Sequence, residues 1–252
     1  MKKKGQITVF IIVGIVMLMS FSIMLLIRGQ FGDKEEDITK VDTSNIRNFI
    51  EGCVQQTARQ SLFYFGFIGG DVAPDPWAEY YIYDDFYKIP FYYHQGKNNM
   101  PSKTTVERDI LAQYIDTKLH RCIGNFEAFK DFEVSYKQPF TNVDINDDFV
   151  LFKTNFEVTT RRDGESTKIL PNYLVTIPLQ LNNMLTITGR VIDMAVADDG
   201  IVPWSFLTDS NDENLNVTAY MDFNKNIIYR MTDKRNDLFG KRYVYQFAVK
   251  VK

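Results

Sequence analysis

The sequence predicts an α+β fold, in which an N-terminal transmembrane helix precedes an extracytoplasmic domain of amphipathic helices packed on a largely antiparallel sheet. Three observations predict it. Residues 7–27 contain no charged side chain. Two segments within residues 44–130 carry apolar residues at helical spacing, whereas apolar and polar residues alternate in many segments from residue 131 onward. The chain of 252 residues is long enough for one large domain or two small ones.

The N-terminal segment is predicted to span a membrane. Residues 1–5 form a basic region, and the helix is expected over residues 6–28. The uncharged part, residues 7–27, would extend about 31 Å, which matches a hydrocarbon core of roughly 30 Å. A cleaved secretory signal is the alternative, but its apolar region is usually about 7–15 residues long. Because basic residues favour the cytoplasm, we expect a single-pass cell-membrane protein with a cytoplasmic N-terminus, an extracytoplasmic domain and lipid as the partner of residues 7–27.

A short motif in front of the apolar segment indicates processing. The string Lys4-Gly5-Gln6-Ile7 resembles the prepilin-type (class III) signals of archaeal surface proteins. In that family a peptidase cuts after the glycine and the apolar helix is retained, which implies a cut between Gly5 and Gln6. The sequence departs from many pilins at Phe10, where those proteins carry a glutamate.

The remaining chain divides into a linker, predicted over residues 29–43, and a domain over residues 44–252. The part of the domain up to residue 130 contains the two helical segments, the second of which is expected to start at Thr104, with Glu107 completing a capping box. The strand-rich part follows over residues 131–252. There, Arg162-Asp163-Gly164-Glu165 predicts a tight hairpin. A third helix is expected around residues 181–195.

Most of the chain resembles an uncharacterised family of exported, membrane-anchored archaeal proteins. The resemblance rests on residues 3–12, on the Cys53 helix that leads into Gly66 and Gly69-Gly70, on residues 89–93 and 96–102, and on the Cys122 helix. It implies a surface-facing, membrane-tethered protein and no known activity.

The cysteines predict a covalent cross-link. The sequence contains two, Cys53 and Cys122, and both lie on apolar faces of predicted helices. Two cysteines in an exported domain indicate a disulfide, which would close a loop of about 70 residues and contribute roughly 4 kcal/mol in the chain-entropy model. The alternative is a pair of buried thiols that act as small hydrophobic side chains.

An aromatic tract is the candidate ligand-binding region. Amphipathic rings offer a large contact area and can stack on sugars or peptide side chains. The alternative is that these rings fill a core or lie at a bilayer interface. The candidates are Trp77, Tyr80, Tyr81, Tyr83, Tyr87, Tyr92 and Tyr93.

Few residues are suited to catalysis or metal binding. Paired carboxylates could act as acid and base or bind calcium, and the candidates are Asp71, Asp75, Asp84 and Asp85, followed by His94. Their spacing matches no calcium loop, so we predict no catalytic residue, no metal site and no cofactor. A net charge of −3 without a basic run beyond the N-terminus argues against a nucleic-acid partner. Asn216-Val217-Thr218 is a sequon, which makes Asn216 a candidate glycosylation site.

The expected function is that of a cell-surface protein with a structural or binding role, rather than an enzyme, and with a surface partner or a second copy of the chain as its partner. One alternative is a type IV pilin-like filament subunit. The processing signal favours it, whereas Gly29 and Gly32 would interrupt the long helix of such a subunit. The other alternative is a membrane-anchored hydrolase, which only the Asp-rich aromatic tract favours.

Overall fold

The computed structural model describes residues 43–69, 80–82 and 88–251. The N-terminal segments predicted above, from the basic region 1–5 to the linker 29–43, lie outside these residues apart from Thr43. The predicted processing site between Gly5 and Gln6 lies outside them as well.

The predicted fold class is wrong. The described residues form a mixed α/β structure with mostly strands, and these strands form three sheets instead of one largely antiparallel sheet. In this part of the chain no helix is long and apolar enough to cross a membrane, so the structure gives no support to the transmembrane helix predicted over residues 6–28. An alternating pattern identifies a strand but not its partner strands, which is why the sheet arrangement was missed.

The helices form where the sequence has helical periodicity. Their bounds are Ser44–Phe67 for α2, Lys103–Thr105 for α3, Val106–Ala112 for the π-helical η1, Gln113–Ile123 for α4, Gly124–Phe126 for the 3-10 helix η2, Leu181–Ala197 for α5 and Trp204–Asp209 for α6. The capping box predicted at Thr104 is wrong. The cap is Ser102, whose hydroxyl oxygen accepts the Thr105 N–H at 3.1 Å. Glu107 instead accepts the backbone N–H of Ile145 at 2.9 Å, which ties η1 to a strand.

The largest sheet joins the aromatic tract to the C-terminus. Its strands are β1 Tyr80–Ile82, β2 Lys88–His94, β3 Lys97–Asn98, β10 Leu215–Met221, β11 Asn226–Leu238 and β12 Lys241–Lys250. The order is β1-β2-β12-β11-β10, and β3 pairs with β2. Neighbouring strands are antiparallel except β2 and β12, which run parallel with Ala248 opposite Phe91. This long-range pairing makes β2 an inner strand of the sheet.

Two smaller antiparallel sheets come from the middle of the chain. One consists of β4 Glu133–Tyr136, β7 Val158–Arg162 and β8 Glu165–Ile169, and the other of β5 Phe140–Ile145, β6 Phe149–Asn155 and β9 Asn172–Pro178. The predicted hairpin is confirmed, because Arg162 pairs with Glu165 across the turn. Asp163 and Gly164 both have positive φ, as a two-residue type I′ turn requires.

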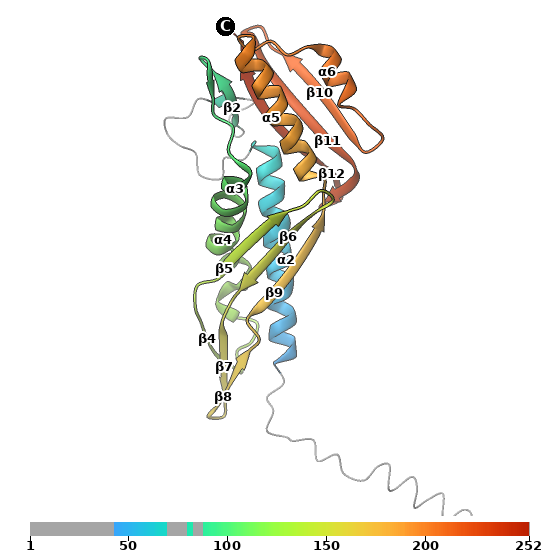
Figure 1. The fold of residues 1–252 in the computed structure, drawn as a ribbon. Coiled ribbons are helices and arrows are strands. Elements are labelled where there is room, and N and C mark those ends of the chain that lie inside the picture. Colours follow the sequence, from blue (N-terminus) through green and yellow to red (C-terminus); the bar gives the residue numbers. More distant parts are fainter. Residues whose placement is uncertain (1–42, 70–79, 83–87, 252) are drawn as a thin grey trace, which may run out of the picture. The chain divides into compact units, whose positions relative to one another are not determined.

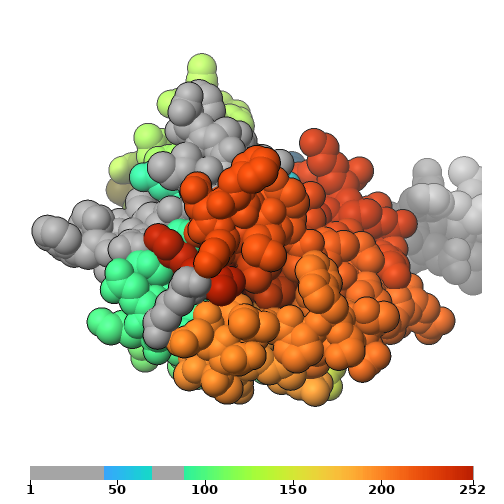
Figure 2. Space-filling model, turned by 90° about the horizontal axis from the view of Figure 1, so that it is seen from above, coloured from blue at the N-terminus to red at the C-terminus, as the bar shows by residue number. Residues whose placement is uncertain are grey.

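Helices α2 and α5 pack on the large sheet. α2 contacts β12 and also lies beside α4, and α5 lies over the sheet and contacts β2, β3 and β12 (Figure 1). Viewed from above, the orange residues of α5 and α6 form much of the visible surface, beside the green β2 region (Figure 2). The buried side chains of α2, α4, α5 and all three sheets form one contiguous hydrophobic core.

Helix α2 approaches β12 closely at Gly66. A Cβ atom on Gly66 would lie 2.3 Å from the backbone carbonyl oxygen of Val244 and 2.8 Å from the ring of Tyr243. Gly66 lies within the helix, one residue before its last residue, Phe67. The absence of a side chain is what allows the helix to contact the strand there.

We expect Gly66→Ala to lower the free energy of unfolding by about 2–3 kcal/mol, because the added methyl group meets backbone atoms that can move only if the helix moves. Gly52→Ala is the matched control in the same helix. Nothing lies within 4 Å of the Cβ position of Gly52, and the change should raise the free energy of unfolding by about 0.5–1 kcal/mol. Urea denaturation of both variants measures the difference. Equal stability of the two variants would contradict the close approach.

Asp116 on α4 is a half-buried carboxylate that costs stability. Burial raises its pKa, and hydrogen bonds with the side chain and backbone of Thr141 oppose that rise. One of its oxygens, Oδ1, is buried without a hydrogen-bond partner. Because the folded-state pKa is raised, the free energy of unfolding is highest below the carboxyl's ordinary pKa and falls as the pH rises through the folded-state pKa.

We therefore expect Asp116→Asn to stabilise the protein at pH 7 by about 0.5–1 kcal/mol and to flatten the stability profile in the acid range. Thermal unfolding between pH 3 and pH 8 measures both effects. Asp109→Asn is the control, because Arg108 lowers the pKa of Asp109 through a hydrogen bond, and that variant should gain nothing. A loss of stability in Asp116→Asn at pH 7 would show that the ionised form is favoured.

Candidate functional site

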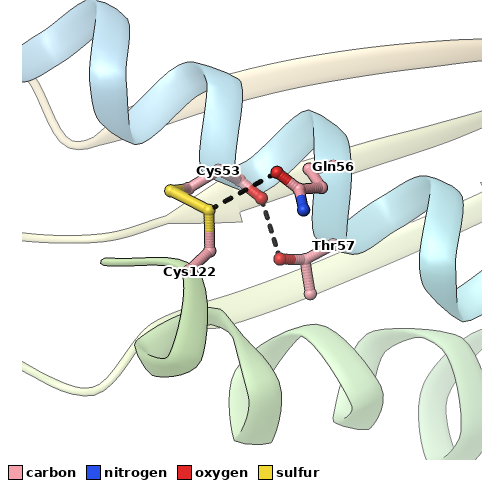
Figure 3. The surroundings of a disulfide bond; sticks show 4 residues. All are labelled: Cys53, Gln56, Thr57 and Cys122. Atoms are coloured by element: carbon pink, nitrogen blue, oxygen red, sulfur yellow. Dashed lines mark hydrogen bonds between the residues drawn. A yellow bond between two sulfur atoms is a disulfide. The ribbon is translucent and has the colours of Figure 1, made fainter. Parts of the chain in front are cut away.

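A disulfide links α2 to α4. Cys53 and Cys122 are bonded, and their Cα atoms are 5.5 Å apart, within the usual range (Figure 3). The predicted disulfide is therefore confirmed, and the alternative of two buried thiols is wrong. Cys53 is buried, whereas Cys122 is partly exposed. One side of the bridge thus lies at the surface.

A groove adjoins this exposed side of the bridge. It has a volume of about 240 Å³, and we call it the α2–α4 groove. Residues of α2 line one wall, and residues of α4 line the other. The lining residues are Gln56, Thr57, Gln60, Tyr64, Tyr114, Lys118, Arg121 and Cys122.

The two helices run antiparallel along the groove, which explains this set of residues. The lining residues of α2 follow Cys53 in the sequence, whereas Tyr114, Lys118 and Arg121 of α4 precede Cys122. Moving away from the disulfide, the two helices therefore run in opposite directions along the groove. At the far end, the rings of Tyr64 and Tyr114 lie 5.8 Å apart between centroids and are tilted by 34°. The disulfide at one end and this tyrosine pair at the other therefore bound the groove.

The polar groups near the disulfide are only partly satisfied within the protein. The Thr57 side chain is buried, with an exposed fraction of 2%, and its hydroxyl donates to the carbonyl oxygen of Cys53 at 2.8 Å (Figure 3). The amide oxygen of Gln56 lies 3.8 Å from the sulfur of Cys122. Because a disulfide sulfur carries no proton, this is a weak polar contact that leaves the amide free to bind another group.

The charge of the groove is positive. Lys118 and Arg121 line it, and among the residues that the structure describes no acidic one does. Burial raises the pKa of Tyr114, the nearby Tyr64 raises it further, and Arg121 opposes the shift. The phenol is therefore neutral at physiological pH and can donate a hydrogen bond. The groove combines cations, amides, a hydroxyl and two rings, which suits binding, and it contains no paired nucleophile and base.

The structure describes only part of the predicted aromatic tract. Trp77, Tyr83 and Tyr87 lie outside the described residues, and Tyr80 and Tyr81 lie in β1.

Tyr92 and Tyr93 lie in the core, with exposed fractions of 2% and 0%. Tyr92 donates to the carbonyl oxygen of Gly69 at 2.7 Å and stacks on Phe247 at 5.3 Å between centroids. The stack of Tyr92 on Phe247 therefore stabilises the contact between β2 and β12. Neither Tyr92 nor Tyr93 lines the groove.

The other predicted candidates that the structure describes do not line the groove either. Asn216 and Thr218 lie on β10, an edge strand, and the Thr218 hydroxyl donates to the carbonyl oxygen of Arg230 at 3.3 Å. His94 ends β2. Among the residues that the structure describes, no group of three or more His, Cys, Asp or Glu side chains could hold a metal ion. The acidic residues that accompany the aromatic tract, Asp71, Asp75, Asp84 and Asp85, lie outside the described part.

Sequence reasoning missed the cationic and amide residues of the groove. On each helix alone, Gln56, Gln60, Lys118 and Arg121 are typical of a solvated polar face. A signal existed, because a Cys53–Cys122 bridge between antiparallel helices would bring together residues three and seven positions after Cys53 and residues one and four positions before Cys122. That deduction requires the direction of packing, which the sequence does not contain.

Comparison of the chain with family models, with curated proteins and with solved structures gives no match. Function is therefore inferred from the disulfide and from the chemistry of the α2–α4 groove.

Proposed function

We propose that this protein is attached to the cell membrane with its disulfide-linked domain outside the cytoplasm, where the domain has a binding role centred on the α2–α4 groove. The observation that carries the proposal is the Cys53–Cys122 bridge. Disulfides form and persist in oxidising compartments and are rare in the cytosol, where thiols are kept reduced.

Two further features support the proposal. The sequence of residues 7–27 is uncharged and follows three lysines, a pattern that favours attachment to the membrane with the N-terminus inside. The groove supports the binding role, because its two cations, Lys118 and Arg121, do not serve to stabilise the fold through an ion pair. Neither forms an ion pair or hydrogen bond with any residue that the structure describes.

Protease treatment of intact cells that express the full chain tests the location. We expect an added protease to degrade the domain at the same rate in intact and in lysed cells, while a cytoplasmic marker protein is degraded only after lysis. Protection of the domain until lysis would overturn the proposal. Alkylation before and after reduction of the same samples should show both cysteines protected in the native protein.

The same preparation tests the filament alternative and the processing site. Intact-mass measurement of the membrane-extracted protein detects loss of the first five residues, as a cut between Gly5 and Gln6 requires. Recovery of the chain in sheared filaments would favour a pilin-like subunit over a membrane-attached binding protein.

A further inference from the structure

The charge of the α2–α4 groove selects for an anion. Lys118 is partly exposed and Arg121 is exposed, and both lack a carboxylate partner among the described residues. An Arg guanidinium binds a carboxylate through two parallel hydrogen bonds, which favours a planar anionic group. The groove therefore offers a carboxylate one fork of donors and one further cation.

The other polar groups indicate a ligand that both donates and accepts hydrogen bonds. Gln56 and Gln60 each present an amide with two donors and one acceptor. A fully ionised phosphate or sulfate offers acceptors alone and would leave the two amide oxygens unpaired, whereas sugar hydroxyls both donate and accept.

The tyrosine pair adds an aromatic surface that suits the C–H face of a sugar. Tyr64 is 43% exposed, and its ring lies 5.8 Å from that of Tyr114. Amphipathic rings bury the C–H face of a sugar while their hydroxyls stay hydrated.

The size of the groove restricts the ligand further. Its volume of about 240 Å³ lies below the roughly 300–1,000 Å³ typical of sites for drug-sized ligands. One monosaccharide unit suits this space better than an extended acidic peptide does.

We propose that the α2–α4 groove recognises a single uronic-acid unit, with Lys118 and Arg121 on the carboxylate, Gln56 and Gln60 on the hydroxyls, and Tyr64 and Tyr114 against the ring. This assignment rests on the proposed function, because it names the ligand class of the same extracytoplasmic binding site.

Titration of the full-chain protein with methyl β-D-glucuronide, followed by saturation-transfer NMR, tests the assignment. We expect a Kd of about 1 mM, the affinity that a ligand of this size reaches at ordinary ligand efficiency. Methyl β-D-glucoside, which carries a hydroxymethyl group in place of the carboxylate, should bind at least tenfold more weakly. Equal affinity for the two sugars, or tighter binding of inorganic phosphate, would overturn the proposal.

Variants connect the binding to the groove. The double variant Lys118→Gln/Arg121→Gln should weaken glucuronide binding at least tenfold and leave glucoside binding unchanged. Arg161→Gln/Lys168→Gln removes the same charge from exposed positions on β7 and β8, and it should change neither affinity. Glucuronide binding that the first double variant does not weaken would show that the sugar binds elsewhere.

One outcome separates this inference from the proposed function. Suppose that the protein binds an acidic hexapeptide but not glucuronide, and that the Lys118→Gln/Arg121→Gln variant no longer binds the peptide. This result would overturn the uronic-acid assignment and leave the binding role intact. Protection of the domain from protease in intact cells would instead remove the proposed function, whatever the sugar titrations show.

Discussion

We expect that replacing Cys53 and Cys122 by alanine lowers the free energy of unfolding by about 4 kcal/mol. The two residues are separated by 69 positions, and cross-linking a loop of that length removes much conformational entropy from the unfolded chain. For a chain of this size the loss corresponds to a Tm lower by about 8–16 °C. Urea denaturation under non-reducing conditions measures the free energy directly.

Reduction provides the control for this prediction. Dithiothreitol should lower the stability of the native protein by a similar amount and should leave the Cys53→Ala/Cys122→Ala variant unchanged. A loss below about 1 kcal/mol in both experiments would show that the unfolded chain is already compact around these helices.

The second large effect is expected at Asp233, a carboxylate with an exposed fraction of 0%. Its Oδ1 accepts the backbone N–H groups of Arg235 and Asn236 at 2.9 and 3.1 Å. Its Oδ2 accepts the side-chain amide of Asn236 at 2.9 Å and the backbone N–H of Gln180 at 3.2 Å. Asp233 therefore joins the irregular part of β11 to the start of α5.

We expect Asp233→Ala to lower the free energy of unfolding by about 3–5 kcal/mol, because four donors lose a buried carboxylate acceptor at once. Asp233→Asn should cost less, since an amide oxygen can still accept the two N–H groups at the irregular part of β11. Chemical denaturation of the two variants, with hydrogen exchange at the start of α5, measures the loss and its location.

Asp237→Ala is the matched control on the same strand. Asp237 pairs with Arg242 at 3.4 Å, and both side chains are about half exposed, so the change should cost less than about 1 kcal/mol. Similar losses at Asp233 and Asp237 would show that the buried hydrogen bonds contribute little beyond an exposed ion pair.

Features set by neighbouring residues could be predicted from the sequence. The helical segments around Cys53 and Cys122 follow from apolar residues at helical spacing, and the hairpin at Asp163-Gly164 follows from a turn that needs positive φ. The disulfide followed from the number of cysteines and the expected compartment. Each of these inferences needs only local sequence or composition.

Features that depend on distant residues could not be predicted. Aromatic residues of the tract could fill a core or bind a ligand, and only the parallel pairing of β2 with β12 decided that Tyr92 and Tyr93 are buried. The single predicted sheet became three because alternation does not name strand partners. The close approach of Gly66 to β12 was not predictable for the same reason, since the strand that it contacts is remote in sequence.

The sequence by itself determined the helical segments around Cys53, Cys122 and residues 181–195, the tight hairpin and the pair of cysteines, because local periodicity, turn chemistry and composition encode them. Only the tertiary structure decided which strands pair, which aromatic rings are buried and where Asp233 finds its donors. It alone brought Lys118 and Arg121 opposite Gln56 and Gln60, because the polar face of a single amphipathic helix is the same whether it borders solvent or a groove.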